Sequence, residues 1–245
     1  MTATAADFLD LQGIPDIELL DDLKTMIVDA SNNIERHLQV ELGPSDVGHP
    51  CARKLALGLM REPRTNPEGD PLPSIVGTAA HTWMEAAARR TDRFLPERRV
   101  TIREGLSGTC DIYDLDTDTV IDWKFPGVTR MKTYKKHGPS AVYRAQAHLY
   151  GQGYINDGYP VKNVAICFLP RGGQLAGAHL WREPYNQALV DETLARIDNT
   201  TLLLTDLDVE QHPERYQLIP ATPDDCEYCP FWSPNPTSPT QCSGG

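Results

Sequence analysis

The middle of the chain carries three short segments whose apolar and polar residues follow the pattern of β-strands, at residues 98–104, 107–113 and 118–125. The turn-forming sequence Asp114-Leu115-Asp116-Thr117-Asp118 separates the last two. They are therefore expected to form a hairpin. Further along, the continuous apolar run 164–169 predicts a buried strand, and residues 178–182 are expected to pair beside it.

Helical spacing of apolar residues dominates the N-terminal part of the chain, over residues 16–42, until Gly43-Pro44 ends the pattern. The apolar positions of that segment are Leu19, Leu20, Leu23, Met26, Ile27 and Ile34. Residues 61–74 carry four prolines and predict a loop. Further helices are predicted at residues 51–57, 75–90, 139–155 and 183–207. The resulting order of helix, three strands, helix and strand predicts an α/β core with a mixed sheet and helices on both faces.

A chain of 245 residues suits a single domain with appendages. We expect one domain over residues 1–245, with a helical arm at 1–60, a core at 75–208 and a Pro-rich, cysteine-rich tail at 220–245.

The net charge is −11, which argues against a protein that coats nucleic acid, but the charge is unevenly distributed. Residues 1–46 hold ten acids and two bases, and residues 183–227 hold eleven acids and two bases. Residues 123–156 hold no Asp or Glu. The bases in this stretch are Lys124, Arg130, Lys132, Lys135, Lys136 and Arg144, interleaved with six aromatic residues. Such a mixture suits single-stranded nucleic acid through phosphate contact and base stacking, and the alternative is a solvated helix face.

The chain lacks an apolar run of the roughly 20 residues that a membrane span needs. Its first ten residues have neither a basic start nor an apolar core, so no secretory signal is predicted. The expectation is a cytoplasmic protein of a bacterial, archaeal or phage-infected cell, without a membrane partner. In such a compartment six cysteines are metal ligands or buried thiols rather than disulfides.

Asp122 and Lys124 lie two apart on a predicted strand, so their side chains project from the same face while Trp123 points away. One interpretation is a surface ion pair, and the other is a metal ligand beside a charge stabiliser. Asp111 lies in the neighbouring predicted strand, again among apolar residues. A buried carboxylate must be paired, protonated or metal-bound, and Mg²⁺ or Mn²⁺ would satisfy both acids.

His81 lies on the predicted helix 75–90, as a core histidine or as a ligand that would favour Mn²⁺ over Mg²⁺. Glu85, one turn further on, either orients that histidine or lies on the surface. Gln146 and Tyr150 share one face of the next helix and could hydrogen-bond phosphate or base, or could be part of an ordinary amphipathic helix.

Four cysteines form a candidate ligand set: Cys226-Glu227-Tyr228-Cys229 is a CxxC motif, Cys242 follows it, and Cys51 lies far upstream. Four thiolates suit an iron–sulfur cluster or a structural Zn²⁺. Cys110 and Cys167 lie in predicted strands and are expected to be buried thiols.

In this order, the motifs resemble the RecB-type branch of the PD-(D/E)XK nucleases, whose pattern is a Gly-x-x-x-His helix, a Gly-x-x-Asp strand, an Asp-x-Lys strand and a Gln-x-x-x-Tyr helix. Here these are Gly77 to His81, Gly108 to Asp111, Asp122 to Lys124 and Gln146 to Tyr150. The cysteines add a resemblance to iron–sulfur exonucleases of the CRISPR-associated type and their phage relatives. The twelve residues between Cys229 and Cys242 are more than that family's pattern has.

The resemblance implies a restriction-endonuclease-like core with Mg²⁺ or Mn²⁺ held by His81, Asp111, Asp122 and the Trp123 carbonyl. It implies Lys124 acting on water or phosphate, and DNA contacts by Gln146 and Tyr150. It also implies a [4Fe–4S] cluster on Cys51, Cys226, Cys229 and Cys242. From the basic tract, Arg144, Lys132, Lys135 and Lys136 are expected to contact DNA as well.

The resulting hypothesis is a metal-dependent DNA exonuclease acting at single-stranded ends, with recombination or CRISPR-adaptation proteins as expected partners. The alternative is a non-catalytic module of the same fold that binds DNA ends or assists CRISPR adaptation.

Overall fold

The computed structural model describes residues 17–32, 42–66, 70–223 and 226–244, and the chain divides into two compact units, residues 1–39 and 40–245. In the first unit the described residues form one helix, α2 (Ile17–Asn32). The predicted helical segment 16–42 is thus helical over 17–32, whereas residues 33–41 lie outside the described residues. In the described part of the chain, no helix has the length and apolar character to cross a membrane.

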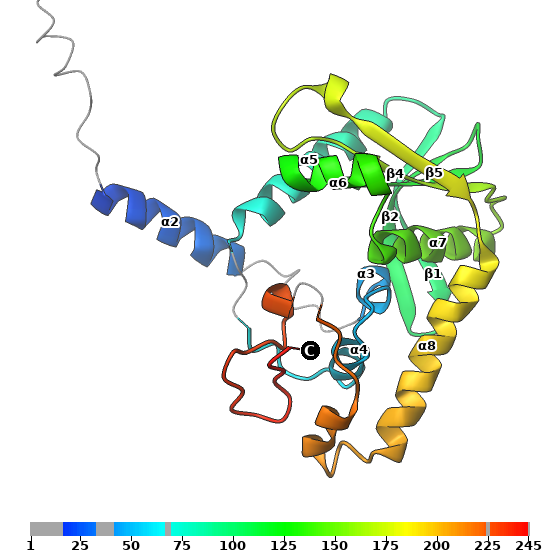
Figure 1. Ribbon diagram of the computed structural model, residues 1–245. Coiled ribbons are helices and arrows are strands. Elements are labelled where there is room, and N and C mark those ends of the chain that lie inside the picture. Colours follow the sequence, from blue (N-terminus) through cyan, green and yellow to red (C-terminus); the bar gives the residue numbers. More distant parts are fainter. Residues whose placement is uncertain (1–16, 33–41, 67–69, 224–225, 245) are drawn as a thin grey trace, which may run out of the picture. The chain divides into compact units, whose positions relative to one another are not determined.

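The second unit is built on a mixed five-stranded sheet in the order β1-β2-β3-β4-β5 (Figure 1). Its strands are β1 (Phe94–Arg103), β2 (Leu106–Asp114), β3 (Thr119–Lys124), β4 (Asn163–Phe168) and β5 (His179–Pro184). Neighbouring strands are antiparallel except β3 and β4, which run parallel. The predicted hairpin and the predicted pairing of residues 178–182 beside the buried strand are both confirmed.

The helices of this unit flank the sheet, so the predicted α/β class is confirmed (Figure 1). They are α3 (Pro44–Val47), α4 (Ala52–Leu59), α5 (Leu72–Ala88), α6 (Val128–His137), α7 (Ala141–Asn156) and α8 (Gln187–Asp206). Helix α7 is the central one: residues 145–151 are all buried, and it packs on the sheet and on α8. The 3-10 turns are η2 (Leu175–Gly177), η3 (Pro213–Leu218) and η4 (Cys226–Tyr228).

Three predicted boundaries were wrong. Strand β1 starts at Phe94 rather than at residue 98, and α5 starts at Leu72, inside the predicted loop, because Pro73 occupies the first helical turn, where a missing N–H costs little. Helix α8 starts at Gln187 because residues 179–184 belong to β5, and Asn186 caps it by accepting a hydrogen bond from the Leu189 N–H.

Helix α6 was not predicted as an element of its own. Only Met131 and Tyr134 are buried on it, one turn apart, while Lys132, Lys135 and Lys136 are exposed. A single buried turn gives too short a periodic signal to distinguish a helix from a basic loop. Together with α7 it forms the crossover that parallel strands β3 and β4 require.

Candidate active site

The regular pairing of β2 with β3 ends where their two acidic residues lie. The ladder contains three residue pairs, and the pair nearest the site joins Ile112 to Ile121. The next two positions hold Asp111 and Asp122. Asp111 Oδ2 accepts a 2.6 Å hydrogen bond from the Trp123 backbone N–H. In a regular ladder this N–H would donate to a backbone carbonyl of the neighbouring strand. Here it donates to the Asp111 carboxylate, and this fixes the orientation of the Asp111 side chain.

The other oxygen of Asp111 faces α5, where His81 Nδ1 lies 3.1 Å from Asp111 Oδ1. Burial lowers the pKa of His81, and the hydrogen bond and charge of Asp111 outweigh this, so the pKa is raised. The ring packs edge-on against Phe125, with 5.3 Å between centroids. The structure thus brings together His81 and Asp111, which the family resemblance implies as ligands of one metal.

Glu97 is a site residue that the sequence reasoning missed. In the described part of the chain, one set of three His, Cys, Asp or Glu ligand atoms lies within 4.8 Å of one another, from His81, Glu97 and Asp111. The β1–β2 register, which pairs Pro96 with Ile112 and Arg98 with Cys110, sets Glu97 opposite Asp111. Glu97 has a φ of +47°, a left-handed conformation that costs free energy for a residue with a Cβ.

Asp122 and Lys124 form an ion pair at the end of β3, with 2.5 Å between Lys124 Nζ and Asp122 Oδ2. Asp122 is only 3% exposed, and Oδ2 accepts no well-aligned hydrogen bond from the described residues. Burial raises the pKa of Asp122 to about 6 although Lys124 opposes the shift. Burial lowers the pKa of Lys124, and Asp122 more than offsets it, so Lys124 is held as an ammonium. The ammonium also lies 4.7 Å from the centroid of the Tyr143 ring.

These groups fit a hard divalent cation. One imidazole and up to three carboxylates, all partly or fully shielded from water, match the ligand preference of Mn²⁺ or Mg²⁺. Asp122 is the most deeply buried of these carboxylates, and its Oδ2 faces the Lys124 ammonium. Trp123 contributes its N–H to Asp111, and its carbonyl as a metal ligand stays a prediction. Glu85, expected either to orient His81 or to lie on the surface, forms an ion pair with Arg89, with 2.6 Å between Glu85 Oε1 and Arg89 Nη2.

A cleft of about 520 Å³ begins at this site. Its walls come from α5, the end of β3, the start of α6, and α7, and they include His81, Lys124, Phe125, Arg130, Tyr143, Arg171 and Tyr228. None of the described residues that line it is Asp or Glu. In a chain with a net charge of −11, an acid-free cleft beside this cluster of acidic residues is suited to an anionic substrate.

Gln146 and Tyr150 lie one turn apart on α7, and the Gln146 Nε2 donates a 3.2 Å hydrogen bond to the Tyr150 hydroxyl. Both side chains are buried, at 8% and 6% exposed. Burial, with the Asp122 charge second, raises the pKa of Tyr150 well above its usual range. A Cβ at Gly108 would lie 2.9 Å from the Tyr150 ring and 2.8 Å from Pro44. The glycine therefore allows α7 to pack closely behind the site.

The predicted DNA-contacting bases occupy two different environments. Lys132, Lys135 and Lys136 project from α6 into solvent. Arg144 on α7 lies 2.6 Å from Glu183 of β5, which also lies 2.6 Å from the buried His148.

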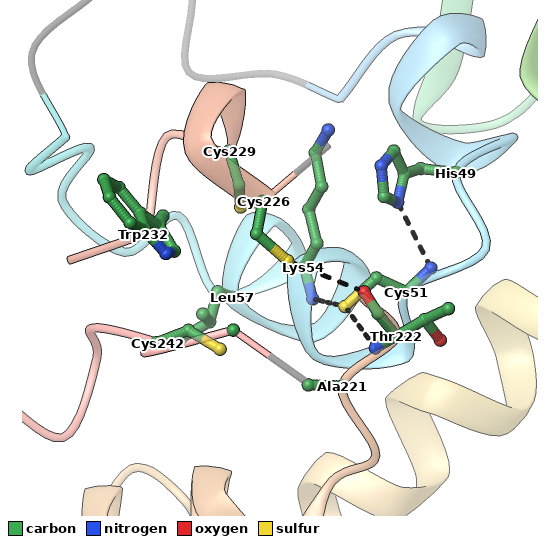
Figure 2. Close-up of a pocket in the computed structure, with 11 residues that line it drawn as sticks. His49, Cys51, Lys54, Leu57, Ala221, Thr222, Cys226, Cys229, Trp232 and Cys242 are labelled. Carbon is green, nitrogen blue, oxygen red and sulfur yellow. Dashed lines mark hydrogen bonds between the residues drawn. The ribbon is translucent and has the colours of Figure 1, made fainter. Parts of the chain in front are cut away.

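The four predicted cysteine ligands line one pocket, in which Figure 2 shows their side chains around a common space. All four are free thiols. Cys51 is the N-cap of α4, and its sulfur accepts hydrogen bonds from the N–H groups of Lys54 and Thr222, each at 3.5 Å (Figure 2). Backbone donors directed at a sulfur stabilise a thiolate, the form that binds metal.

Arg53, beside Cys51, links α4 to the tail. It is buried, and its guanidinium donates to the carbonyls of Ile219 and Gln217 and, at 3.4 Å, to Cys242 Sγ. Cys242 is held in turn by an N–H donated to the Phe231 carbonyl. The structure thus brings Cys242 to the pocket despite its long spacing from Cys229.

No family model matches the chain, and no curated protein matches it in sequence. Solved structures with a related backbone include an alkaline exonuclease, LHK-Exo, from Laribacter hongkongensis (TM-score 0.42, 13% identity, 72% of this chain and 97% of that chain). Another is a phage-related exonuclease from Haemophilus somnus 129PT (TM-score 0.48, 14% identity, 65% of this chain and 82% of that chain). A third is SSO0001 (TM-score 0.49, 14% identity, 84% of this chain and 92% of that chain). All three TM-scores are below one half, so the likeness is distant.

Proposed function

We propose that this protein is a metal-dependent nuclease that hydrolyses phosphodiester bonds of DNA, acting as an exonuclease at single-stranded ends. The observation that carries the proposal is the joint placement of His81, Glu97 and Asp111 within 4.8 Å of one another, next to the buried Asp122–Lys124 pair. A structural ion pair would account for Asp122 and Lys124. It would not account for a second carboxylate, a histidine and a strained glutamate converging beside them.

His81, Glu97, Asp111 and Asp122, with the Trp123 carbonyl, are the proposed ligands of Mg²⁺ or Mn²⁺. When bound, a divalent cation supplies Lewis-acid charge to the phosphate and makes water a stronger nucleophile at neutral pH. The imidazole favours Mn²⁺ over Mg²⁺.

Lys124 contributes a fixed positive charge rather than a base. The adjacent Asp122 raises its pKa despite burial, so its ammonium stays protonated at neutral pH and cannot accept a proton from water. It can donate hydrogen bonds to a phosphate oxygen or orient an attacking water. Contact with the Tyr143 ring on one side and Asp122 on the other restricts its position.

Single-stranded DNA is the proposed substrate because the cleft combines cations with aromatic side chains, of which Tyr228 is exposed. The exposed Lys132, Lys135 and Lys136 of α6 are proposed to contact its phosphates. Arg144, which forms an ion pair with Glu183, is proposed to contact phosphate as well. Gln146 and Tyr150, which lie behind the site on α7, are proposed to position the DNA. Tyr150 is close enough to Asp122 for that charge to contribute to its raised pKa.

The cysteine pocket is proposed to hold a structural [4Fe–4S] cluster, with Zn²⁺ as the alternative. The support is that four cysteine side chains line one pocket, which is the ligand number that either group takes. Recombination or CRISPR-adaptation proteins are the proposed partners.

The test is digestion of 5′- and 3′-labelled single-stranded DNA by purified protein with Mn²⁺, with Mg²⁺ and with chelator. Metal-dependent release of nucleotides from one labelled end supports the proposal and reveals the polarity. Retention of intact DNA on the protein, with no release under any metal, would instead favour a non-catalytic DNA-end-binding module.

A further inference from the structure

Tyr228 connects the cysteine pocket to the candidate active site. It is the residue between Glu227 and Cys229 in the CxxC segment, and Cys226 and Cys229 on either side of it line the cysteine pocket. Tyr228 itself lines the other cavity, the cleft that contains His81 and Lys124. Its side chain is 69% exposed, so the ring is available to a ligand rather than packed in a core.

The segment that carries Tyr228 is fastened to the chain just before α5. The side-chain amide of Asn66 donates 2.9 Å hydrogen bonds to the carbonyls of Glu227 and Cys229, on both sides of the tyrosine. The backbone N–H groups of Thr65 and Asn66 both donate to the Pro230 carbonyl. Residues 65–66 lie shortly before α5, which carries His81. The backbone on both sides of Tyr228 is thus held by Thr65 and Asn66.

The cleft offers phosphate and base contacts next to each other. Lys124, Arg130 and Arg171 supply positive charge, and none of the described lining residues supplies a carboxylate. Tyr228 supplies an exposed π-face in the same cavity. Cations that hold phosphate next to an aromatic face are the combination that single-stranded nucleic acid recognises, because its bases are free to leave their neighbours.

We propose that Tyr228 stacks on a base near the end of a single DNA strand in the cleft, and that the cysteine pocket fixes the tyrosine there. This inference rests on the proposed function, because Tyr228 would be the residue that selects unpaired strands in the proposed substrate cleft. A base inside a duplex is stacked on both faces and cannot offer one to Tyr228 without being extruded. The cysteine site thereby influences substrate binding without contacting DNA.

The test measures binding by fluorescence anisotropy, with an end-labelled oligothymidylate in buffer without added divalent metal, so that cutting plays no part. Tyr228→Ala should raise the Kd between about fivefold and a hundredfold, the range for one stacked base. Tyr228→Trp should restore binding. Trp83→Ala, which removes an equally exposed aromatic (68%) from α5 outside the cleft, should leave the Kd unchanged.

An oligonucleotide with abasic residues at its end separates stacking from a structural role, because it keeps the phosphates and lacks the bases. Tyr228→Ala should not weaken binding of that probe. The double variant Cys226→Ser, Tyr228→Ala tests whether the cysteine pocket acts through Tyr228, and it should bind oligothymidylate no more weakly than Tyr228→Ala alone. Equal Kd values for parent and Tyr228→Ala, or equal losses on abasic and thymidine ends, would overturn the proposal. Failure of the proposed function has a separate signature, namely oligothymidylate binding that depends on Tyr228 without metal-dependent release of nucleotides.

Discussion

The backbone N–H of Trp123 donates to Asp111 Oδ2 at 2.6 Å, and so ties the carboxylate of β2 to the backbone of β3. One oxygen of Asp111 is thereby committed to the neighbouring strand, and the other is directed at His81. Asp111 is held before any cation arrives, which lowers the entropic cost of binding one. The arrangement accounts for a carboxylate at this position rather than an amide, since only the carboxylate offers two acceptor oxygens.

The first prediction concerns the metal site. Asp111→Asn and Glu97→Gln should each weaken Mn²⁺ binding by more than about a hundredfold, since loss of a ligand costs more than loss of an outer partner. Electron paramagnetic resonance of free Mn²⁺ measures this directly. Glu104→Gln, at the exposed β1–β2 turn, is the matched control and should bind Mn²⁺ like the parent. Normal affinity in Glu97→Gln would remove Glu97 from the ligand set.

The second prediction concerns Gly108. A Cβ there would lie 2.8 Å from Pro44 and 2.9 Å from the Tyr150 ring, so Gly108→Ala should destabilise the fold by about 1–3 kcal/mol. Urea denaturation measures the loss. Gly77→Ala is the control, since nothing lies within 4 Å of its Cβ position and α5 gains a better helix former, which should stabilise by up to about 1 kcal/mol. Equal stability of the two variants would contradict the close packing of α7.

The third prediction is a pH dependence of stability that arises away from the site. Arg93 lowers the pKa of Asp114 to about 2, with help from the Thr117 hydroxyl and the Asp116 N–H. The folded pKa lies below the unfolded value of 3.8, so this carboxylate stabilises the fold above about pH 4. That stabilisation is lost as the pH falls toward 2.

Asp114→Asn should therefore lower the free energy of unfolding at pH 7 by about 1–2 kcal/mol, allowing for solvent screening of the half-exposed Arg93. It should also flatten the fall in stability between pH 4 and pH 2. Asp92→Asn, which removes an exposed carboxyl from the neighbouring turn, is the control. If the stability of Asp114→Asn fell between pH 4 and pH 2 as steeply as that of the parent, Asp114 would not be the source of this pH dependence.

The elements around the site were predictable where local pattern and packing agree. Asp111, Asp122 and Lys124 lie in strands with a regular pattern, and His81 lies on a long helix. The periodicity of the sequence therefore predicted the elements that carry these residues and the strand face that Asp122 and Lys124 share. Glu97 was missed because Pro96 and a positive φ interrupt the regular pattern of β1, and the predicted strand began after it. Only the antiparallel register, a tertiary property, sets it opposite Asp111.

The cysteine pocket shows a different limit. Residue type and spacing indicated a common ligand set, but the approach of Cys51 to Cys242 depends on Arg53 and on the backbone around Ile219. The position of Tyr228 in the cleft has no sequence signal, because it depends on hydrogen bonds from Asn66, over 160 residues earlier in the chain. Contacts of this range do not leave a periodic pattern in the sequence.

The fourth prediction concerns the cysteines. Protein purified without oxygen should be brown, absorb near 400 nm and contain about four iron atoms per chain, and Cys51→Ser should lose the iron and lower the Tm. Cys167→Ser is the control: burial raises the pKa of this thiol to about 11, so it is a poor ligand, and the variant should keep its iron. A colourless parent with one zinc per chain would contradict the cluster and favour Zn²⁺.

The assignment of Asp122 and Lys124 to the active site is tested by the rate of Mn²⁺-dependent cleavage of end-labelled single-stranded DNA by the parent, by Lys124→Ala and by Asp122→Ala. The parent should cleave only with metal, and each variant should be slower by about 10³-fold, equivalent to roughly 4 kcal/mol of transition-state stabilisation. Circular dichroism should show the fold retained. Cleavage by both folded variants at the parent rate would contradict the assignment of Asp122 and Lys124 to the active site.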